Sequence, residues 1–429
     1  MGFQQGLSGL DGATSQLDAI GNNIANANTV GFKASTAEFS DVYAASLNGS
    51  GASQTGIGTK LSTIAQQFSQ GNITASNSPL DMAINGQGFF RMSQNGTISY
   101  SRDGQFQLDK NGYLVNAQGL QLTGYQASNS GAIVAATPVP LMIPTANLSP
   151  SATSTATVGL NLNSGSTVPT AGTFNPTDPT SFNNSTSMTV YDSLGNSHVV
   201  TMYFALASST TTPPALASTT ASTTWNTYLT VDGTAVTGTP TPALGQLGFN
   251  ASGTMVYPAA TGTLKLGQIN ATVPGTITPG ANPLNMVLDF SATTQYGAAF
   301  GVNQLSQNGY TSGQLSGFNT GPSGIIQGTY SNGQSKNLGQ IVLANFADPQ
   351  GLQSQGNNQW SESTASGAAL VGAPATGSLG VIQSGATEAS NVDLTAELVN
   401  LITAQRNYQA NAQTIKTEDQ IQQTLVNLR

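Results

Sequence analysis

The chain has 429 residues, of which only 7% are charged, and its formal net charge at pH 7 is -8. No Lys or Arg occurs from Asn111 to Leu264, so nucleic acid is not expected as a partner. The chain has no cysteine, which excludes a disulfide scaffold and thiol catalysis. No apolar run approaches the ~20 residues of a membrane span, and Met1–Gly12 lacks the features of a secretory signal peptide. We therefore expect neither membrane insertion nor a cleaved leader.

The start of the chain carries apolar residues at helical spacing. The members of this seam are Leu7, Leu10, Leu17 and Ile24. Spacings of three and four residues place them along one side of a helix, in a seam as narrow as that of a coiled coil. Gly31 is a plausible stop after the asparagine-rich last turns. The pattern predicts a helical segment over residues 1–28 and an extended connector over residues 29–71.

From about Asn72 the pattern changes to short apolar alternations separated by tight turns. The turn dipeptides are Asn85-Gly86, Asn95-Gly96, Asp103-Gly104 and Asn111-Gly112. Such dipeptides tolerate the positive φ that hairpin turns need, so they indicate antiparallel sheet. Asp109, Asn111 and Gly112 resemble the start of a calcium loop, but the later ligands are missing, and a hairpin turn accounts for them better.

A second β region follows a stretch rich in Pro, Ser, Thr and Ala at residues 138–154. A hairpin is predicted where the turn 192–196 separates apolar runs at 188–191 and 199–204. The Thr/Ser/Ala/Pro run 208–224 is interpreted as an exposed loop. Segments of the first style return near Asn308. We therefore expect a first β domain over 72–145 and 308–390, with an outer β domain over 146–307 inserted into it.

The end of the chain carries a second helical seam. Its members are Leu394, Leu398, Leu401, Tyr408, Ile415 and Leu425. The expected fold is mainly β with terminal α-helices: nested antiparallel β domains and a helical coiled-coil domain built from residues 1–28 and 391–429. The ten apolar residues of the two terminal seams are the candidate polymerisation residues.

Two narrow seams at opposite ends indicate self-assembly. Ordering one residue costs ~1–2 kcal/mol of backbone entropy, and a buried Leu returns ~1.5–3 kcal/mol only when something covers it. One hypothesis is that both ends are largely disordered in the free monomer and fold against each other and against neighbouring copies. The alternative is a helix pair docked on the body of its own chain, and the periodicity does not distinguish the two.

The residues offer no site for chemistry. His198 is the only histidine, so a site with two histidine ligands cannot form, and a plain strand residue is the better interpretation. No convergent cluster of polar residues indicates an enzyme. We expect no catalytic, cofactor or metal site.

Several segments resemble a known family, that of the bacterial flagellar rod and hook axial proteins. Residues 22–33 (NNIANANTVGFK) resemble its N-terminal signature, and residues 390–394 (SNVDL) with 404–411 (AQRNYQAN) resemble its C-terminal signature. Residues 100–106 (YSRDGQF) and 109–114 (DKNGYL) are similar to an interior segment of rod and hook proteins. Residues 191–198 (YDSLGNSH), within the predicted insertion, resemble the hook members of the family.

The resemblance implies a structural protein. Hook subunits are exported by the flagellar type III apparatus and polymerise beneath a hook cap into a short, curved, hollow tube. That tube is a universal joint that passes motor torque from rod to filament. The resemblance implies self-association, contacts with rod and hook–filament junction proteins, no cofactor, and an extracellular location in the basal body–hook structure.

Two other functions remain as alternatives. A distal rod subunit belongs to the same family, but rod proteins resemble this chain without the inserted domain. A secreted β-rich adhesin could share the Thr/Ser-rich β domains, but it would lack the paired terminal seams.

Overall fold

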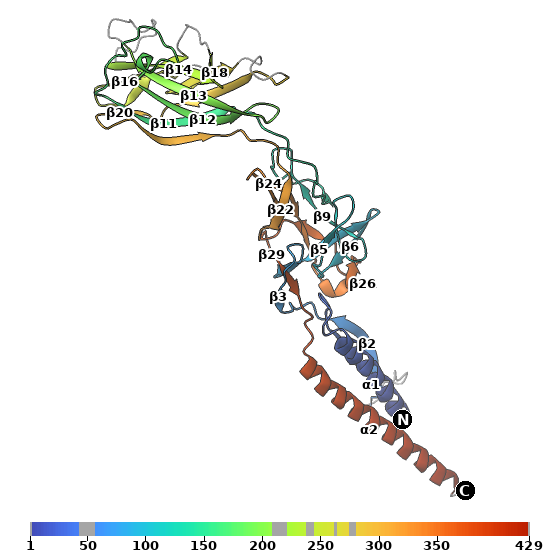
Figure 1. Ribbon diagram of the computed structural model, residues 1–429. Helices are drawn as coiled ribbons and strands as arrows, with labels where there is room; N and C mark the ends of the chain where they lie inside the picture. The colour runs from blue at the N-terminus through green and yellow to red at the C-terminus, as the bar shows by residue number, and fades with distance from the viewer. Residues whose placement is uncertain are drawn as a thin grey trace. The chain divides into compact units, whose positions relative to one another are not determined.

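The computed structural model describes residues 2–42, 56–207, 221–236, 244–260, 264–273 and 280–427. Within these ranges the chain is mainly β. It begins with helix α1 (Gly2–Ala25) and ends with helix α2 (Leu394–Asn427), and the two helices lie side by side (Figure 1). The predicted fold class is therefore confirmed. The chain forms two compact units. The first contains Met1–Thr145, Ser316–Thr329 and Ser335–Arg429, and the second contains Ala146–Leu315 and Tyr330–Gln334.

The first unit holds both helices and a sheet of 13 strands, whose main path is β22-β23-β24-β9-β5-β6-β27-β26. The strands on this path are β5 (Phe89–Gln94), β6 (Thr97–Ser101), β9 (Gln121–Gln126), β22 (Leu315–Thr320), β23 (Ile325–Tyr330), β24 (Ser335–Ile341), β26 (Gln353–Gly356) and β27 (Gln359–Ser361). Branching from it are β7 (Gln107–Leu108), β8 (Leu114–Val115), β10 (Val139–Pro140), β25 (Leu343–Asn345) and β28 (Leu370–Gly372). Two-stranded sheets are formed by β3 (Ile73–Ala75) with β30 (Ala386–Glu388), by β4 (Met82–Asn85) with β29 (Val381–Ser384), and by β1 (Ser35–Val42) with β2 (Gly58–Gln66).

An aromatic cluster fills part of the core of this unit. Phe89 and Tyr100 each meet Phe346 edge to face, and Phe89 also meets Trp360. All four side chains are buried. The turn at Asp109 joins β7 to β8, and its carboxylate accepts bonds from the backbone N–H groups of Asn111 and Tyr113, both at 2.8 Å. The predicted hairpin turn is thus confirmed at this point.

The second unit is a sandwich of two sheets with a continuous apolar core. One sheet contains β11 (Thr155–Asn163), β18 (Gln268–Val273), β19 (Leu284–Asp289), β20 (Thr294–Tyr296) and β21 (Gly301–Gln307). The other contains β12 (Asn184–Tyr191), β13 (Ser197–Leu206), β14 (Thr223–Val231), β15 (Thr234–Val236), β16 (Gly245–Phe249) and β17 (Met255–Tyr257). The predicted hairpin is β12–β13, with Val190 opposite His198. Most pairs are antiparallel, but β11 runs parallel to β19 and β20.

Three predicted ranges differ from the structure in detail. Residues 308–315 belong to the second unit, because Tyr310 bridges to Ser151 and Gly313 bridges to Leu148. The predicted connector 29–71 contains the β1–β2 sheet, whose two strands are separated in the sequence by a stretch of small residues. Of the predicted loop 208–224, residues 208–220 lie outside the described residues, and β14 begins at Thr223.

Candidate assembly interface

The two helices of the first unit lie side by side and run in opposite directions. Asn23, near the end of α1, donates from its amide to Glu397 Oε1 at 2.9 Å, close to the start of α2. At the other end, a Cβ built on Gly6 would lie 2.9 Å from Ile415 Cγ1, and one on Gly9 would lie 2.7 Å from Asn411 Oδ1. Side chains at these two glycines would force Ile415 and Asn411 to move, so glycine permits the close approach of the helices.

The β1–β2 sheet, hereafter the hairpin, lies against α1. Ala37 is opposite Ile64 and Phe39 is opposite Leu61, so these four side chains share one face. A Cβ on Gly12 of α1 would lie 3.4 Å from Phe39 Cε1. Phe39, Leu61 and Ile64 nevertheless remain exposed. A single helix of small residues therefore covers only part of the apolar face of the hairpin.

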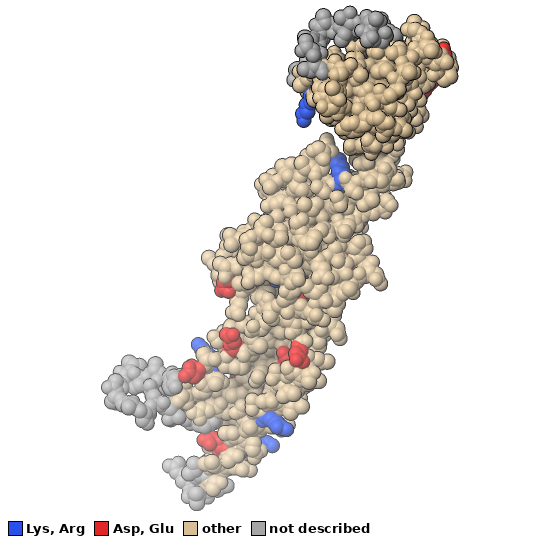
Figure 2. Space-filling view, turned by 90° about the vertical axis from the view of Figure 1, so that its left-hand side faces the viewer, with Lys and Arg blue, Asp and Glu red and all other residues tan. Residues whose placement is uncertain are grey.

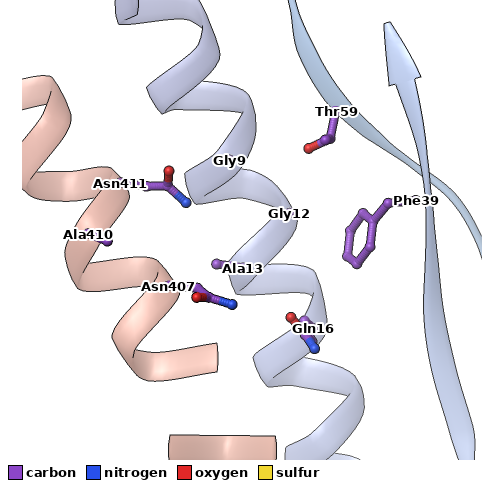
Figure 3. Close-up of a pocket in the computed structure, with 9 residues that line it drawn as sticks. All are labelled: Gly9, Gly12, Ala13, Gln16, Phe39, Thr59, Asn407, Ala410 and Asn411. Atoms are coloured by element: carbon purple, nitrogen blue, oxygen red, sulfur yellow. The ribbon is translucent and has the colours of Figure 1, made fainter. Parts of the chain in front are cut away.

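A groove, hereafter the α1 groove, runs over α1 between α2 and the hairpin, and it has a volume of about 340 Å³ (Figure 3). Its lining residues are Gly9, Gly12, Ala13 and Gln16 from α1, Phe39 and Thr59 from the hairpin, and Asn407, Ala410 and Asn411 from α2. None of these residues is charged. On the face of the molecule in Figure 2, charged side chains are likewise few and scattered.

Most of the predicted seam residues lie beside the helix contact, but Ile415 lies in it, against Gly6. Leu7, Leu394, Leu398 and Tyr408 are exposed. Half-buried members are Leu10, Leu17, Ile24, Leu401 and Ile415. The side chain of Leu425 lies outside the described residues. Small residues such as Gly6 and Ala13 occupy the buried side of α1, so the predicted role of the seam in polymerisation stays a prediction.

Helix α2 is largely exposed and carries several large apolar side chains on its surface. Among its described side chains only Ala404 is buried. Besides the seam residues, four more apolar side chains on it are exposed: Val399, Ile402, Ile421 and Val426. Exposed apolar surface of this extent marks an interaction site in a soluble protein.

A buried ionic cluster lies where the two ends of the chain meet the β body. Lys33 Nζ lies 2.7 Å from Glu388 Oε1, and Arg102 Nη1 lies 3.1 Å from Glu388 Oε2. The side chains of Lys33, Arg102 and Glu388 are 0%, 4% and 0% exposed, respectively. Burial lowers the pKa of Lys33 and of Arg102, and the negative charge of Glu388 opposes this effect in both cases. We call these three residues the ionic junction.

Further hydrogen bonds extend this junction. Lys33 Nζ also donates to Ser69 O at 2.7 Å, and the backbone N–H of Gly71 donates to Glu388 Oε1 at 2.8 Å. Asn391 accepts from the N–H of Ala34 at 2.8 Å and donates to Gln67 O at 2.7 Å. The residues just before α2 are thereby hydrogen-bonded to the residues just after α1 and to the segment that precedes β3.

Sequence reasoning did not identify this junction, although a signal for it was present. Lys33 ends the N-terminal signature segment, Arg102 lies in the interior segment 100–106, and Glu388 precedes the C-terminal signature by two residues. In a chain with only 10 basic and 18 acidic residues, a charge at each of these places is conspicuous. Their contact could not be inferred, because residues 33, 102 and 388 are far apart in sequence.

The single histidine lies beside two aspartates of the second unit. His198 lies on β13, with Nδ1 2.6 Å from Asp232 Oδ2 and Nε2 3.5 Å from Asp192 Oδ2. Within the described ranges no group of three His, Cys, Asp or Glu residues could hold a metal ion. Neither α1 nor α2, as described, combines the length and the apolarity needed to cross a membrane.

Comparisons with known proteins find flagellar rod and hook proteins along the chain. Four family models match in order: Flagella basal body rod protein at residues 3–33, Flagellar hook protein FlgE/F/G D1 domain at 83–168, Flagellar basal body protein FlaE D2 domain at 161–310, and Flagellar basal body rod FlgEFG protein C-terminal at 383–428. The flagellar hook protein FlgE of Escherichia coli (strain K12) is 43% identical over 435 residues, with 100% of each chain covered. That of Rhizobium meliloti is 32% identical and covers 100% of this chain.

The chain belongs to the flagellar hook protein family. The suspected family is therefore confirmed. A solved structure, that of the Helicobacter pylori flagellar hook protein FlgE2, aligns with a TM-score of 0.50 at 15% identity, covering 72% of this chain and 99% of that one. This likeness supports the fold alone. In this hook-family chain, the ionic junction joins segments near the ends of the two terminal family models, those at 3–33 and 383–428.

Proposed function

We propose that this chain is the structural subunit of a flagellar hook and that it polymerises with copies of itself through α1, α2 and the hairpin. The observation that carries the proposal is the exposed apolar surface of α2, on which Ala404 alone is buried among the described side chains. Surface of this kind is costly in a free monomer and is stabilising once a neighbour covers it. Membership of the hook family supports the same conclusion.

The finer features of the proposal concern the polymer. A contact between two different patches repeats without closing and builds a helical tube, whereas a self-complementary patch stops at a dimer. Paired terminal helices give such a tube a stiff inner layer. The sparse charge of the chain leaves contacts between outer surfaces without strong ion pairs, so subunits slide past one another at low cost while the tube bends. These properties suit a curved joint that transmits torque from rod to filament.

The proposal also includes partners and location. The subunits would leave the cell through the flagellar type III export apparatus, assemble beneath a hook cap, and meet rod proteins at one end and hook–filament junction proteins at the other. They would lie outside the cell, in the basal body–hook structure. The domain division into terminal helices (1–28 and 391–429), a first β domain and an inserted outer domain is part of this proposal.

The alternatives are weaker on specific grounds. A distal rod subunit is disfavoured by the inserted domain, which matches its own family model at residues 161–310. A secreted adhesin is disfavoured by full-length similarity to hook proteins. An enzyme is disfavoured by the family, whose members named above are hook proteins.

Electron microscopy of purified protein tests the proposal. Polymerisation of the full chain is compared with that of a variant lacking residues 1–28 and 391–429, which retains the ionic junction. We expect hollow fibres from the full chain and none from the truncated one. Circular dichroism should show that the truncated variant keeps its β structure. Normal hollow fibres from the truncated chain would refute a role for the terminal helices.

A further inference from the structure

We propose that Asn23 is a positioning residue for assembly. Its side-chain amide holds α1, α2 and the hairpin of one copy in a single arrangement, and it is this arrangement that neighbouring copies meet. The inference rests on the proposed polymerisation, to which Asn23 contributes by orienting elements of its own chain.

The amide of Asn23 is buried, and its hydrogen-bonding groups are engaged. Asn23 is 1% exposed. Its Nδ2 donates to Ser35 O at 2.8 Å and to Glu397 Oε1 at 2.9 Å, while its Oδ1 accepts from the backbone N–H of Ser35 at 2.8 Å. Ser35 is the first residue of β1, and Glu397 lies in the first turn of α2. An asparagine amide has two N–H donors, so a single side chain joins three elements here.

Asn23 takes the place of a neighbouring strand at the edge of the hairpin. The backbone N–H of Gln67 donates to Ala34 O at 2.7 Å, so Ala34 and Gln67 are a hydrogen-bonded pair of the antiparallel ladder. In the next pair, Ser35 with Gln66, the backbone groups therefore point away from the partner strand. Those of Ser35 are satisfied by the amide of Asn23, which fixes the end of α1 against the start of β1.

A second amide, that of Asn391, holds the same end of the hairpin from the side of α2. Its Oδ1 accepts from the N–H of Ala34 at 2.8 Å, and its Nδ2 donates to Gln67 O at 2.7 Å. It completes the Ala34–Gln67 pair, in which one bond is direct and the other passes through the amide. Asn391 lies three residues before the start of α2, so both helices are attached to the base of the hairpin.

The apolar contacts around Asn23 do not by themselves select this arrangement. Helix α1 approaches α2 at Gly6 and Gly9, and it approaches the hairpin at Gly12. Contact between small apolar surfaces is weak and non-directional, whereas a hydrogen bond requires its donor and acceptor to be aligned. A single buried asparagine fixes the register of coiled coils for this reason.

The register of the helix pair agrees with this role. Asn23 contacts Glu397, and Gly9 faces Asn411. These two contacts are 14 residues apart on each helix, which is two heptads, so they belong to one antiparallel register. A shift of one heptad would displace the exposed side chains of α2 by about 10 Å along α1. Copies in different registers could not occupy equivalent places in a repeating polymer.

Reversing the polarity of the Asn23–Glu397 bond tests this role. Asn23→Asp removes both donors and places a carboxylate opposite that of Glu397, so the critical concentration for polymerisation should rise at least tenfold. When Asn23→Asp is combined with Glu397→Gln, the new amide donates to the new carboxylate across the same contact. The critical concentration should then return to within threefold of that of the unmodified chain, which a role in packing alone would not produce.

The matched control is Asn22→Asp. Asn22 is exposed on α1, one residue earlier, and its side chain accepts a hydrogen bond from Asn26. This substitution adds the same charge at the same end of the helix, yet it should change the critical concentration less than twofold. Glu397→Gln alone keeps Oε1 as an acceptor and should change it less than threefold. Urea denaturation of each variant checks that the β structure remains stable.

A disulfide reports the arrangement of the helices directly, because the chain has no cysteine of its own. A Cβ at position 9 would lie 2.8 Å from Asn411 Cγ, so Gly9→Cys with Asn411→Cys places two sulfurs within bonding reach. Polymer of this background is mildly oxidised, and the fraction of single chains that carry the internal disulfide is measured on a non-reducing gel. The yield should fall at least fivefold with Asn23→Asp and recover when Glu397→Gln is added.

The outcomes separate this inference from the proposed function. An unchanged critical concentration for Asn23→Asp would overturn the positioning role and leave polymerisation standing. So would a double variant in which either the critical concentration or the disulfide is not restored, since Asn23 would then be a packing residue only. A failure of the unmodified chain to form any fibre would overturn both proposals.

Discussion

Replacing Glu388 with Gln removes the counter-charge that contacts both Lys33 and Arg102 in the ionic junction. Both cations would remain buried, and Arg102 Nε already lacks a hydrogen-bond partner among the described residues. Removing one member of a buried ion pair costs ~3–5 kcal/mol, which is a large part of the ~5–15 kcal/mol that stabilises a typical domain. We expect the first unit to lose stability by about 3–5 kcal/mol.

Urea denaturation followed by tryptophan fluorescence measures this effect in each unit separately. Trp360 is buried in the first unit and Trp225 is buried in the second. In a Trp225→Phe background, the midpoint reported by Trp360 should fall by about 1–5 M urea, given a slope of ~1–3 kcal/mol per M. In a Trp360→Phe background, the transition reported by Trp225 should not move.

A double variant provides the matched control. Lys33→Met combined with Glu388→Gln removes one cation together with the anion, so it leaves one buried cation unpaired instead of two. It should be more stable than Glu388→Gln alone, with a coupling energy of about 1–3 kcal/mol. If Glu388→Gln left the transition of the first unit unchanged, or if the double variant were less stable than the sum of the two single variants, the electrostatic account of the junction would be refuted.

Three further predictions concern pH, helix packing and helix ordering. Burial, reinforced by the nearby Glu362, raises the pKa of Tyr100 to about 12, so the unfolded chain ionises this phenol first. Because the unfolded state then binds fewer protons, the first unit should lose about 1 kcal/mol of stability between pH 9 and pH 11 through this residue. Urea denaturation at both pH values measures the loss, and Tyr100→Phe should make it smaller. In the polymer, Gly9→Val should weaken the α1–α2 contact by about 1–3 kcal/mol because its Cβ would meet Asn411. Gly21→Ala, with nothing near its Cβ, should instead stabilise α1 by about 0.5–1 kcal/mol. Thermal circular dichroism of the polymer at 222 nm measures both effects, and equal effects at the two glycines would contradict the close packing. Finally, we expect α1 and α2 to be largely disordered in the free monomer and to gain helicity on polymerisation, as observed by proton NMR or circular dichroism, and full helicity of the monomer would count against this hypothesis.

Much of the fold could be predicted from local patterns. A spacing of three and four residues predicted helices at both ends, because a helix has 3.6 residues per turn and its stripe is visible in any window of the chain. The Asn-Gly dipeptides at 95–96 and 111–112 predicted the turns of the β5–β6 and β7–β8 hairpins, since few other residues accept positive φ. Asn85-Gly86 and Asp103-Gly104 do not join paired strands, because β4 pairs with β29 and β7 pairs with β8. These signals depend only on neighbours in sequence, so they need no knowledge of the tertiary structure.

The sides on which elements meet were decided by the tertiary structure. The seam that contains Leu7 and Leu398 suggested which face of each helix would be covered, yet α1 and α2 approach through Gly6, Gly9 and Ala13 and leave much of the seam exposed. Hydrophobic periodicity identifies an apolar face but does not identify what covers it. Small residues carry no periodic signal of their own, although they set the distance at which two helices can pack.

By itself, the sequence determined the terminal helices, the β character of the interior, the insertion of one β region into another, and the family. Only the tertiary structure decided that Lys33, Arg102 and Glu388 share one buried site, that the hairpin covers α1, and that a groove remains between α1, α2 and the hairpin. The physical reason is that these features depend on contacts between residues tens to hundreds of positions apart. Such contacts arise from how whole elements pack, and local composition does not encode them.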